Sequence, residues 1–464
     1  MSVPQLEPRR TVRLGASVRW PMGGSAAALG VGVAAGHSLA LGIGVLGVLV
    51  VSYIVILEPF VGVVILAALT PVTAALKRGL VVPHLRPSEA LIVWLAPLVI
   101  LSARRPVRPW GRLEWLGLAY AGGTLLLGGF DVWRRDAPFD SSNLDGMLGP
   151  LEYMALLRAV RVGVRTERQA NVVVRALLLM SVPVCLFALL QGFGVSWAQH
   201  LSHVLTGVDD GHPSRATGPF TNWQVLAGYL LSVGLIAVSV AAFRAERIFT
   251  VAIAVALAVL IAAGLARTLT IGALAGFTVG SGALIVMGRR MRVDARRLLW
   301  FVGLGIVVLG VVLATRYQQE FVARPGQASN GIVPNTVMDR IHNWIQQYLP
   351  ALSGRWVTGY GPQIPPDVTW KYTDSVYVTI ILRGGLLLFA LYAALMTGFV
   401  GVARSAKAAV PEAQAIATAL LVLVLVLVPL QTIATYFTTS GLPEVTWILA
   451  SLASILVARR TART

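Results

Sequence analysis

Long uninterrupted runs of apolar residues dominate the second half of this chain. The hydrocarbon core of a bilayer is about 30 Å thick, and a helix needs roughly 20 apolar residues to cross it. The sequence predicts such helices near 172–191, 223–243, 248–264, 268–287, 298–314, 375–402, 413–432 and 442–458. Only 12% of the 464 residues are charged, against roughly 25% in a soluble domain. These runs indicate an all-α polytopic membrane protein of about 11 to 13 transmembrane helices.

The N-terminal third is harder to divide into membrane spans. Apolar stretches occur at 26–57, 60–76, 89–102 and 113–130. The first can form one long span or two short ones, and 89–102 is too short to cross without tilting. The stretch 147–160 is also short and is compatible with a partial span. The number of spans in this third therefore stays open.

The basic residues lie in short connectors between the apolar runs. There are 38 lysines and arginines against 20 acids, for a net charge of +18. On a soluble protein this charge would suggest nucleic acid, but here the clusters alternate along the chain as cytoplasmic loops do. We therefore expect no nucleic-acid partner and a cytoplasmic C-terminus. The clusters are Arg161/Arg165/Arg168, Arg244/Arg247, 289–297, Arg404/Lys407 and Arg459/Arg460/Arg463.

This alternation divides the chain into parts. We expect a cytoplasmic N-terminal tail (1–25), a transmembrane bundle (26–314), an extracytoplasmic loop (315–374), the last three transmembrane helices (375–458) and a cytoplasmic tail (459–464). Within the loop, apolar side chains recur at helical spacing near 335–352, which predicts an amphipathic helix. The loop is also rich in tryptophan and tyrosine, which a linker would not need. A folded cap on the membrane surface is therefore favoured over a linker.

Sequence motifs of soluble enzymes are absent. No Walker loop, dinucleotide-binding glycine fingerprint or HExxH pair occurs. Asp209, Asp210 and His212 lie together in a connector, but this pattern is more often a solvated turn than a metal site. Cys185 is the only cysteine, which excludes a disulfide within the chain. We expect neither a metal nor a cofactor.

A set of arginines lies on the side opposite the basic clusters. Its members are Arg215, Arg267, Arg340 and Arg383, the last within a predicted span. A charged group at membrane depth is costly unless it is paired or hydrated. Arginine suits phosphate, because its planar fork makes bidentate bonds and stays charged. Ligand binding is the stronger interpretation for Arg215 and Arg267; the alternative is that each snorkels to headgroups or pairs with an internal acid.

Asp374 and Tyr377 open the span that follows the long loop. At this spacing they would share one face of a helix. Asp374 is either the N-cap of that helix or an acid at the water boundary that acts as a base or orients a ligand. Arg383 lies nine residues beyond Asp374 and would point away from it on a straight helix.

Several segments in the region 180–400 resemble the O-antigen ligase/polymerase family of bacterial membrane glycosyltransferases. RATGPFTNWQVLAGYL resembles the family's arginine-glycine-phenylalanine-asparagine entry to a span, and LARTLTIGALAGFTVG resembles its arginine-started span of small residues. MDRIHNWIQQYLPALSGRWVTGYGP resembles its loop element, and DSVYVTIILRGGLLLF resembles the span that follows. LLQGFG matches the end of an earlier span. The resemblance depends on the order and spacing of these segments more than on any single segment.

The resemblance implies a many-helix membrane bundle with an extracytoplasmic loop over its site. It implies transfer of a glycan from a polyprenyl diphosphate carrier to an acceptor hydroxyl, with inversion and without a metal. Arg215, Arg267 and Arg340 would then hold the diphosphate, with Tyr377 and Arg383 as further substrate-binding candidates. The partners implied are the lipid-linked oligosaccharide, a glycan acceptor and membrane lipids.

The sequence departs from this family where the acceptor would be activated. The family's histidine and asparagine are replaced by Asp374 and Ser375. A carboxylate still accepts a proton, with a basicity that depends on its surroundings. The departure favours a polysaccharide polymerase over a lipopolysaccharide ligase. His342 is a substitute base, to be weighed against a plain polar residue of the loop.

These features predict a glycosyltransferase of the cytoplasmic (inner) membrane, with its site on the extracytoplasmic side. One alternative is a transporter or flippase for an anionic lipid or solute, which would also use membrane arginines. The other is a non-catalytic scaffold in envelope assembly. The large one-sided aromatic loop argues against the transporter.

Overall fold

A computed structural model describes most of the chain. The residues outside the description are 1–38, 81, 83–84, 104–108, 137–140, 208–214, 290–334, 364–367, 369–372, 407–409, 440 and 462–464. The span expected near 298–314 and the connector with Asp209, Asp210 and His212 therefore lie outside the described residues. The chain divides into two compact units, Met1–Glu58 and Pro59–Thr464. The first contains the apolar helix α2 (Leu39–Leu57), and the second contains all the other described helices.

The second unit consists of helices, and no strand occurs in the part of the chain that is described. Its helices differ in length, and several are joined by connectors of only a few residues. They are α3 (Pro59–Thr73), α4 (Pro87–Leu101), α5 (Arg112–Arg134), α6 (Ser141–Gly163), α7 (Glu167–Gly192), α8 (Ser196–Thr206), α9 (Trp223–Ala242), α10 (Val251–Arg267), α11 (Ile271–Arg289), α13 (Asn335–Asn343), the π-helical turn η1 (Trp344–Tyr348), α14 (Leu349–Ala351), α15 (Val376–Ser405), α16 (Pro411–Leu430) and α17 (Leu442–Thr461).

Five of these helices are long and apolar enough to cross a membrane, among the residues described. They are Glu167–Gly192, Trp223–Ala242, Ile271–Gly288, Val376–Ser405 and Pro411–Leu430. Together with the all-helical content, they confirm the expected class of all-α polytopic membrane protein. The 147–160 stretch belongs to a longer helix, α6, of 23 residues. At 1.5 Å per residue, that helix is about 34 Å long. Polar residues such as Arg158 and Arg161 do not end it, because they are buried in the bundle.

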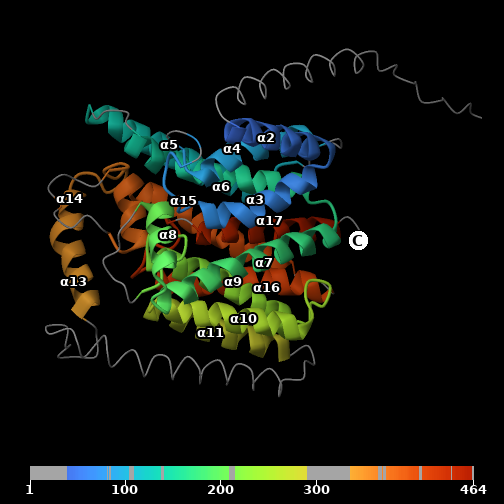
Figure 1. Ribbon diagram of the computed structural model, residues 1–464. Coiled ribbons are helices and arrows are strands. Elements are labelled where there is room, and N and C mark those ends of the chain that lie inside the picture. The colour runs from blue at the N-terminus through green and yellow to red at the C-terminus, as the bar shows by residue number, and fades with distance from the viewer. Residues whose placement is uncertain are drawn as a thin grey trace, which may run out of the picture. The chain divides into compact units, whose positions relative to one another are not determined.

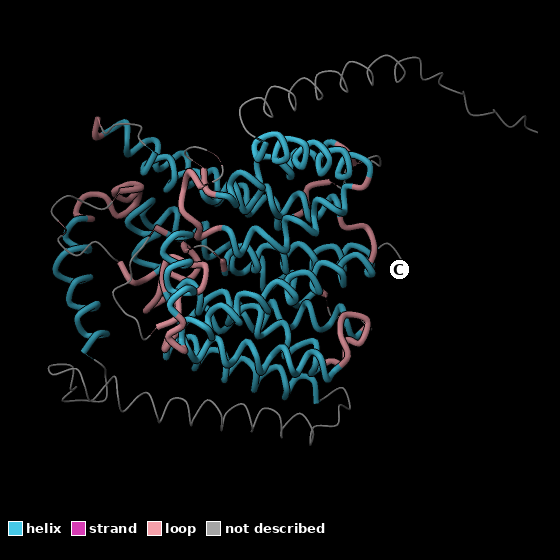
Figure 2. Tube along the Cα trace, viewed as in Figure 1, coloured by secondary structure: helices cyan, strands magenta, loops and turns pink. Residues whose placement is uncertain are grey.

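The helices pack side by side, with the connecting loops at their two ends (Figures 1 and 2). Helix α9 is apolar all round and packs against α7, α10, α11, α16 and α17, which surround it. Helix α5 packs between α6 and α15. We call the end that carries 192–222, 268–270, 335–375 and 431–441 the loop end. The other end carries Arg244, Arg247 and Arg404, and we call it the basic end.

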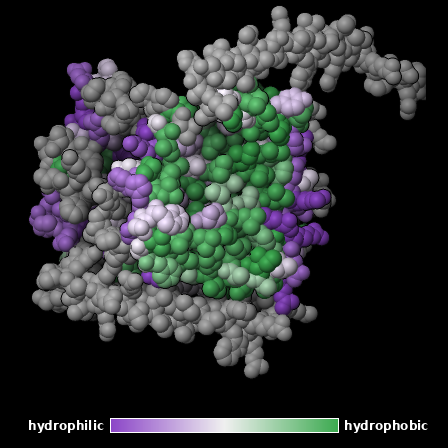
Figure 3. Space-filling view, viewed as in Figure 1, coloured by the Kyte–Doolittle hydropathy of each residue, from purple (hydrophilic) through white to green (hydrophobic). Residues whose placement is uncertain are grey.

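The sides of the helices expose apolar side chains. Figure 3 shows a hydrophobic band with hydrophilic residues at both of its ends. Large apolar side chains on the spanning helices are exposed, and Val279 of α11 is 68% exposed. An exposed apolar surface of this extent is unfavourable in water and natural in lipid. The band therefore agrees with a bilayer-embedded bundle whose charged residues gather at the two ends.

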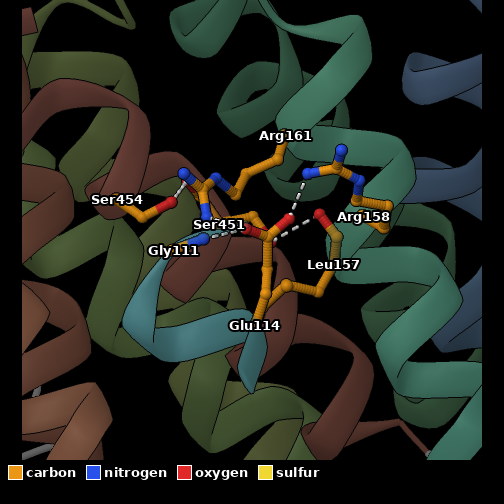
Figure 4. A network of polar contacts seen from close by, with 7 residues as sticks. All are labelled: Gly111, Glu114, Leu157, Arg158, Arg161, Ser451 and Ser454. Carbon is orange, nitrogen blue, oxygen red and sulfur yellow. Dashed lines mark hydrogen bonds and ion pairs between the residues drawn. The ribbon is translucent and has the colours of Figure 1, made fainter. Parts of the chain in front are cut away.

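A buried ion network ties α5, α6 and α17 together at the basic end (Figure 4). The carboxylate of Glu114, with a fully buried side chain, accepts a hydrogen bond from Arg158 at 2.6 Å and pairs with Arg161 as well. It also accepts the backbone N–H of Gly111 at 2.7 Å, which closes the first turn of α5. Ser451 of α17 donates to a backbone carbonyl of α6. The network is a packing device, because all its members lie away from the loop end.

Helix α15 is broken in its third turn by two glycines. Gly384 has φ −153° and ψ 21°, and Gly385 has φ 62° and ψ −163°, so the helical hydrogen-bond ladder is interrupted there. The segment 356–361 of the long loop replaces the missing partners. Its bonds are Tyr360 N to Leu382 O at 2.6 Å, Gly361 N to Leu382 O at 3.1 Å, Leu386 N to Trp356 O at 2.8 Å and Leu387 N to Val357 O at 3.2 Å. The loop is therefore attached to α15 through its backbone.

Substitution of Gly385 by alanine is expected to destabilise the protein by about 3 kcal/mol. A Cβ at this position would lie 2.2 Å from the carbonyl oxygen of Val357, at a φ that side chains rarely adopt. We expect a lower unfolding midpoint in a detergent thermal melt. The control is Gly401→Ala in the same helix, where a Cβ meets no atom within 4 Å. Equal midpoints for the two variants would contradict the account of the break.

Candidate functional site

Three segments far apart in the sequence meet at the loop end around Gln191. This residue is the last but one of α7, and its side-chain oxygen accepts the N–H groups of Thr217 at 3.1 Å and Gly218 at 2.6 Å. The N–H of Ala216 donates to the carbonyl of Arg267 at 3.0 Å. Because the residue after Arg215 is bonded to Arg267, the structure places these two predicted site residues next to each other along the backbone.

The side chains of Arg215 and Arg267 both lie against aromatic rings and are half-buried. The guanidinium carbon of Arg267 is 4.4 Å from the ring centre of Phe193, and its Nη1 donates to the carbonyl of Gly192 at 3.2 Å. A Cβ on Gly192 would lie 2.7 Å from Cδ of Arg267, so the glycine makes room for the arginine. The guanidinium of Arg215 lies 4.7 Å from the ring centre of Trp223.

Arg340 of α13 forms an ion pair with Asp374. Its Nε is 3.5 Å from Oδ2 of the carboxylate, and the side chains are 21% and 17% exposed. Nη1 of Arg340 also donates to the carbonyl of Ile433 at 2.8 Å. Ile433 lies beside the first turn of α11. A Cβ built on Gly272 of that turn would be 3.8 Å from Cδ1 of Ile433. Through Ile433 the pair is therefore linked to the start of α11, the helix that follows Arg267, at the loop end.

The cap of α15 is Ser375 and not Asp374. The Ser375 side chain accepts the N–H of Val378, whereas Asp374 precedes the helix at φ 51°, in the left-handed region. Asp374 and Tyr377 consequently do not share a helical face. The phenol of Tyr377 instead donates to the carbonyl of Val428 at 2.6 Å and joins α15 to α16. A non-glycine residue in the left-handed region is uncommon, and such residues gather at functional sites.

The π-helical turn η1 places Tyr348 beside Asp374. Tyr348 is fully buried and packs with Leu352, Val368 and Leu382, which forms a small core between the loop and α15. Burial and the nearby carboxylate of Asp374 raise the pKa of this phenol to about 12. The group therefore stays protonated and neutral at physiological pH. Isolated π turns often occur at functional sites, and the helical spacing of the sequence did not indicate this one.

His342 is not brought to this pair. It is exposed on α13, two residues after Arg340. Residues at that spacing lie on different faces of a helix. As a candidate base it is therefore less well placed than Asp374.

Arg383 lies elsewhere, in a cavity of about 210 Å³ at the loop end. No hydrogen bond or ion pair links its guanidinium to another described residue, and its electrostatic neighbours are the phenols of Tyr120 and Tyr153. The cavity walls are rich in charged side chains. They comprise Ala74, Arg78, Arg86, Ser88, Glu89, Tyr120, Gly146, Gly149, Pro150, Glu152, Tyr153, Pro362, Arg383, Phe437, Thr438 and Glu444.

The acids of this cavity were missed by the sequence interpretation. Glu89, Glu152 and Glu444 are single carboxylates at the start of apolar runs or inside them. An isolated acid in a membrane helix usually faces the interior and has a function. That rule could have found them without a structure.

Comparison with known protein families matches residues 256–393 to the family described as O-antigen ligase. The matched region includes Arg267, Arg340, Asp374 and Arg383, and Arg215 lies before it. No curated protein matches the chain.

Proposed function

We propose, from the match of residues 256–393 to the O-antigen ligase family, that the chain transfers a polyprenyl-diphosphate-linked oligosaccharide to an acceptor hydroxyl. We place this reaction at the outer face of the cytoplasmic membrane, with the loop end outside. The observation that carries the proposal is the gathering of Arg215, Arg267, Arg340 and Asp374 at one end of an apolar bundle. Guanidinium groups can stabilise the charge on a departing diphosphate, and a carboxylate can take the proton of the acceptor.

In this proposal the acceptor oxygen forms a bond to the anomeric carbon of the donor sugar. The bond from that carbon to the diphosphate breaks, and its electron pair passes to the diphosphate oxygen. Arg215 and Arg267 stabilise the negative charge that grows there, as preorganised cations do. Asp374 takes the proton of the acceptor hydroxyl. A single displacement of this kind inverts the anomeric carbon, and the arginines supply the positive charge without a metal.

The ion pair between Arg340 and Asp374 suggests how the base is made available. Before the donor binds, the carboxylate is held by Arg340 at 3.5 Å. Arginine binds phosphate through two parallel hydrogen bonds, whereas the ion pair with Asp374 is made through Nε alone at 3.5 Å, so donor binding would draw Arg340 away from Asp374. The base would then be released only when a donor is present. A polymerase is favoured over a ligase because Asp374 and Ser375 replace the histidine and asparagine that the family resemblance leads us to expect.

The direct test uses purified protein in lipid nanodiscs with a polyprenyl-diphosphate oligosaccharide and no other protein. We expect a ladder of longer lipid-linked glycans on a gel. Addition of a lipid-A core acceptor should leave the ladder unchanged. Transfer to that core without a ladder would identify a ligase. Movement of intact donor across a sealed bilayer, with no new glycosidic bond, would support a flippase instead.

Topology is tested by cysteine labelling of intact cells. The only native cysteine, Cys185, is buried, so a new cysteine reports its own position. His342→Cys, exposed on α13, should react with a membrane-impermeant maleimide. Glu246→Cys, exposed at the basic end, should react only after lysis. The reverse pattern would invert the proposed orientation.

A further inference from the structure

The cavity around Arg383 has a lining without net charge. Three arginines (Arg78, Arg86, Arg383) and three glutamates (Glu89, Glu152, Glu444) line it, so their formal charges sum to zero. Arg78 and Arg86 share Glu89, at 2.6 Å and 3.7 Å. Such a lining disfavours a diphosphate, which would face three carboxylates, and disfavours a lipid tail, which would face charged groups.

The unshared polar groups suit a molecule that both donates and accepts hydrogen bonds. Arg383 offers donors and has no acid partner among the described residues. Glu444 offers acceptors, and its carboxylate is oriented by the N–H of Gly441 at 2.6 Å. Vicinal hydroxyls of a sugar can accept from a guanidinium and donate to a carboxylate at the same time. A neutral polyhydroxylated ligand satisfies both groups.

Aromatic rings complete the lining. Tyr120, Tyr153 and Phe437 border the cavity. Tyr153 is held nearly parallel to Trp447, with ring centres 6.3 Å apart, and Tyr120 contacts Tyr392 at 6.0 Å. These rings are fixed in place by packing. An aromatic ring with a polar tip offers the apolar face of a sugar ring a contact and its hydroxyls a partner.

Arg383 of the cavity and the proposed base Asp374 lie on the same stretch of chain, at α15 and just before it. From Val376, two residues after Asp374, the helix rises about 10 Å to Arg383. We infer that the cavity is the acceptor subsite, which binds a neutral sugar residue of the glycan whose terminal hydroxyl is presented to Asp374. The identification of the bound sugar as the acceptor rests on the proposed function. Binding of a free oligosaccharide to the cavity does not depend on that function.

Gly149 allows the cavity to be filled without disturbing its walls. It is part of the lining, and a Cβ built on it meets no atom within 4 Å. Gly149→Leu should therefore occupy the space from α6. Gly282→Leu is the matched control, since it is also a helical glycine with no atom within 4 Å of its Cβ, in α11 and away from the cavity.

The probe is the repeat-unit oligosaccharide released from the lipid-linked donor by mild acid. Saturation-transfer NMR should show binding to the wild type and to Gly282→Leu, and a loss of affinity of about tenfold or more for Gly149→Leu. In the transfer assay, Gly149→Leu should raise KM for this acceptor and leave KM for the donor unchanged. Oligosaccharide binding by Gly149→Leu equal to that of the wild type would overturn the subsite.

The two proposals can fail separately. If the wild type binds the free oligosaccharide and Gly149→Leu does not, but no transfer occurs, the glycan site stands and the transferase proposal falls. If transfer occurs and Gly149→Leu has wild-type KM for both substrates, the transferase stands and the subsite is wrong. Arg267→Lys should bind the free oligosaccharide normally, because Arg267 is not part of the cavity.

Discussion

The substitution Asp374→Asn is expected to lower the rate of glycan transfer by about 10²- to 10⁴-fold, the range that a general base contributes. The amide is uncharged and cannot accept the acceptor's proton. The measurement is the initial rate of ladder formation with the purified lipid-linked donor. Donor binding, measured separately, should be kept or slightly strengthened, because Arg340 loses its competing carboxylate.

The structure indicates that Asp374→Asn should fold normally, so that a lower rate would not result from misfolding. Asparagine adopts the left-handed conformation as readily as aspartate, and the position has φ 51°. The asparagine oxygen can still accept a hydrogen bond from Arg340, so the unfolding midpoint should change little. Asp339→Asn, an exposed residue on α13, is the control for the same chemical change. Full transfer activity in Asp374→Asn would remove Asp374 from the role of base.

A second substitution, Asp374→His, tests whether another proton acceptor can replace the carboxylate. Histidine also tolerates the left-handed region better than most residues, and it is the residue that the family resemblance leads us to expect at this position. We therefore expect Asp374→His to recover part of the activity that Asp374→Asn loses. An inactive Asp374→His that folds and binds donor would mean that the carboxylate contributes more than proton acceptance.

The spanning helices could be predicted from sequence, because an apolar run of bilayer length has few other uses. The runs 172–191 and 223–243 became α7 and α9 with nearly the same bounds. Helix α6 was underestimated, because its polar first residues 141–146 lie outside the apolar stretch, and because Glu152 and Arg158 lower its hydropathy although they face a cavity and an ion pair inside the bundle. Hydropathy averages all faces of a helix and cannot show which face a charged residue occupies.

The sequence indicated which residues belong to the candidate site, but it did not indicate which of them contact each other. Arg340 and Asp374 were both singled out, but their contact depends on a helix in the loop and on the non-helical residue before α15. The meeting of 356–361 with Gly384 and Gly385 depends likewise on a break that only three-dimensional packing reveals. Contacts between distant segments of this kind leave no periodic signal in the sequence.

The substitution Arg267→Lys is expected to lower kcat/KM for the lipid-linked donor by roughly 100-fold or more, as removal of one charge-stabilising donor does. Lysine keeps the positive charge but lacks the planar fork that binds phosphate in two places. Its ammonium also stacks less well on Phe193, over which the guanidinium now lies at 4.4 Å. The measurement is donor saturation kinetics in nanodiscs, with Arg404→Lys at the basic end as the matched control.

A structural role for Arg267 predicts a different result. Its side chain donates to the carbonyl of Gly192 at 3.2 Å, so a loss of packing alone would lower the unfolding midpoint together with the rate. Phosphate binding predicts a normal midpoint, weakened donor binding and unchanged affinity for the free oligosaccharide. Arg267→Lys with normal donor kinetics would show that positive charge is enough, or that the diphosphate binds elsewhere. The bidentate role would then have to be abandoned, because the fork is the one feature that the substitution removes while the charge remains.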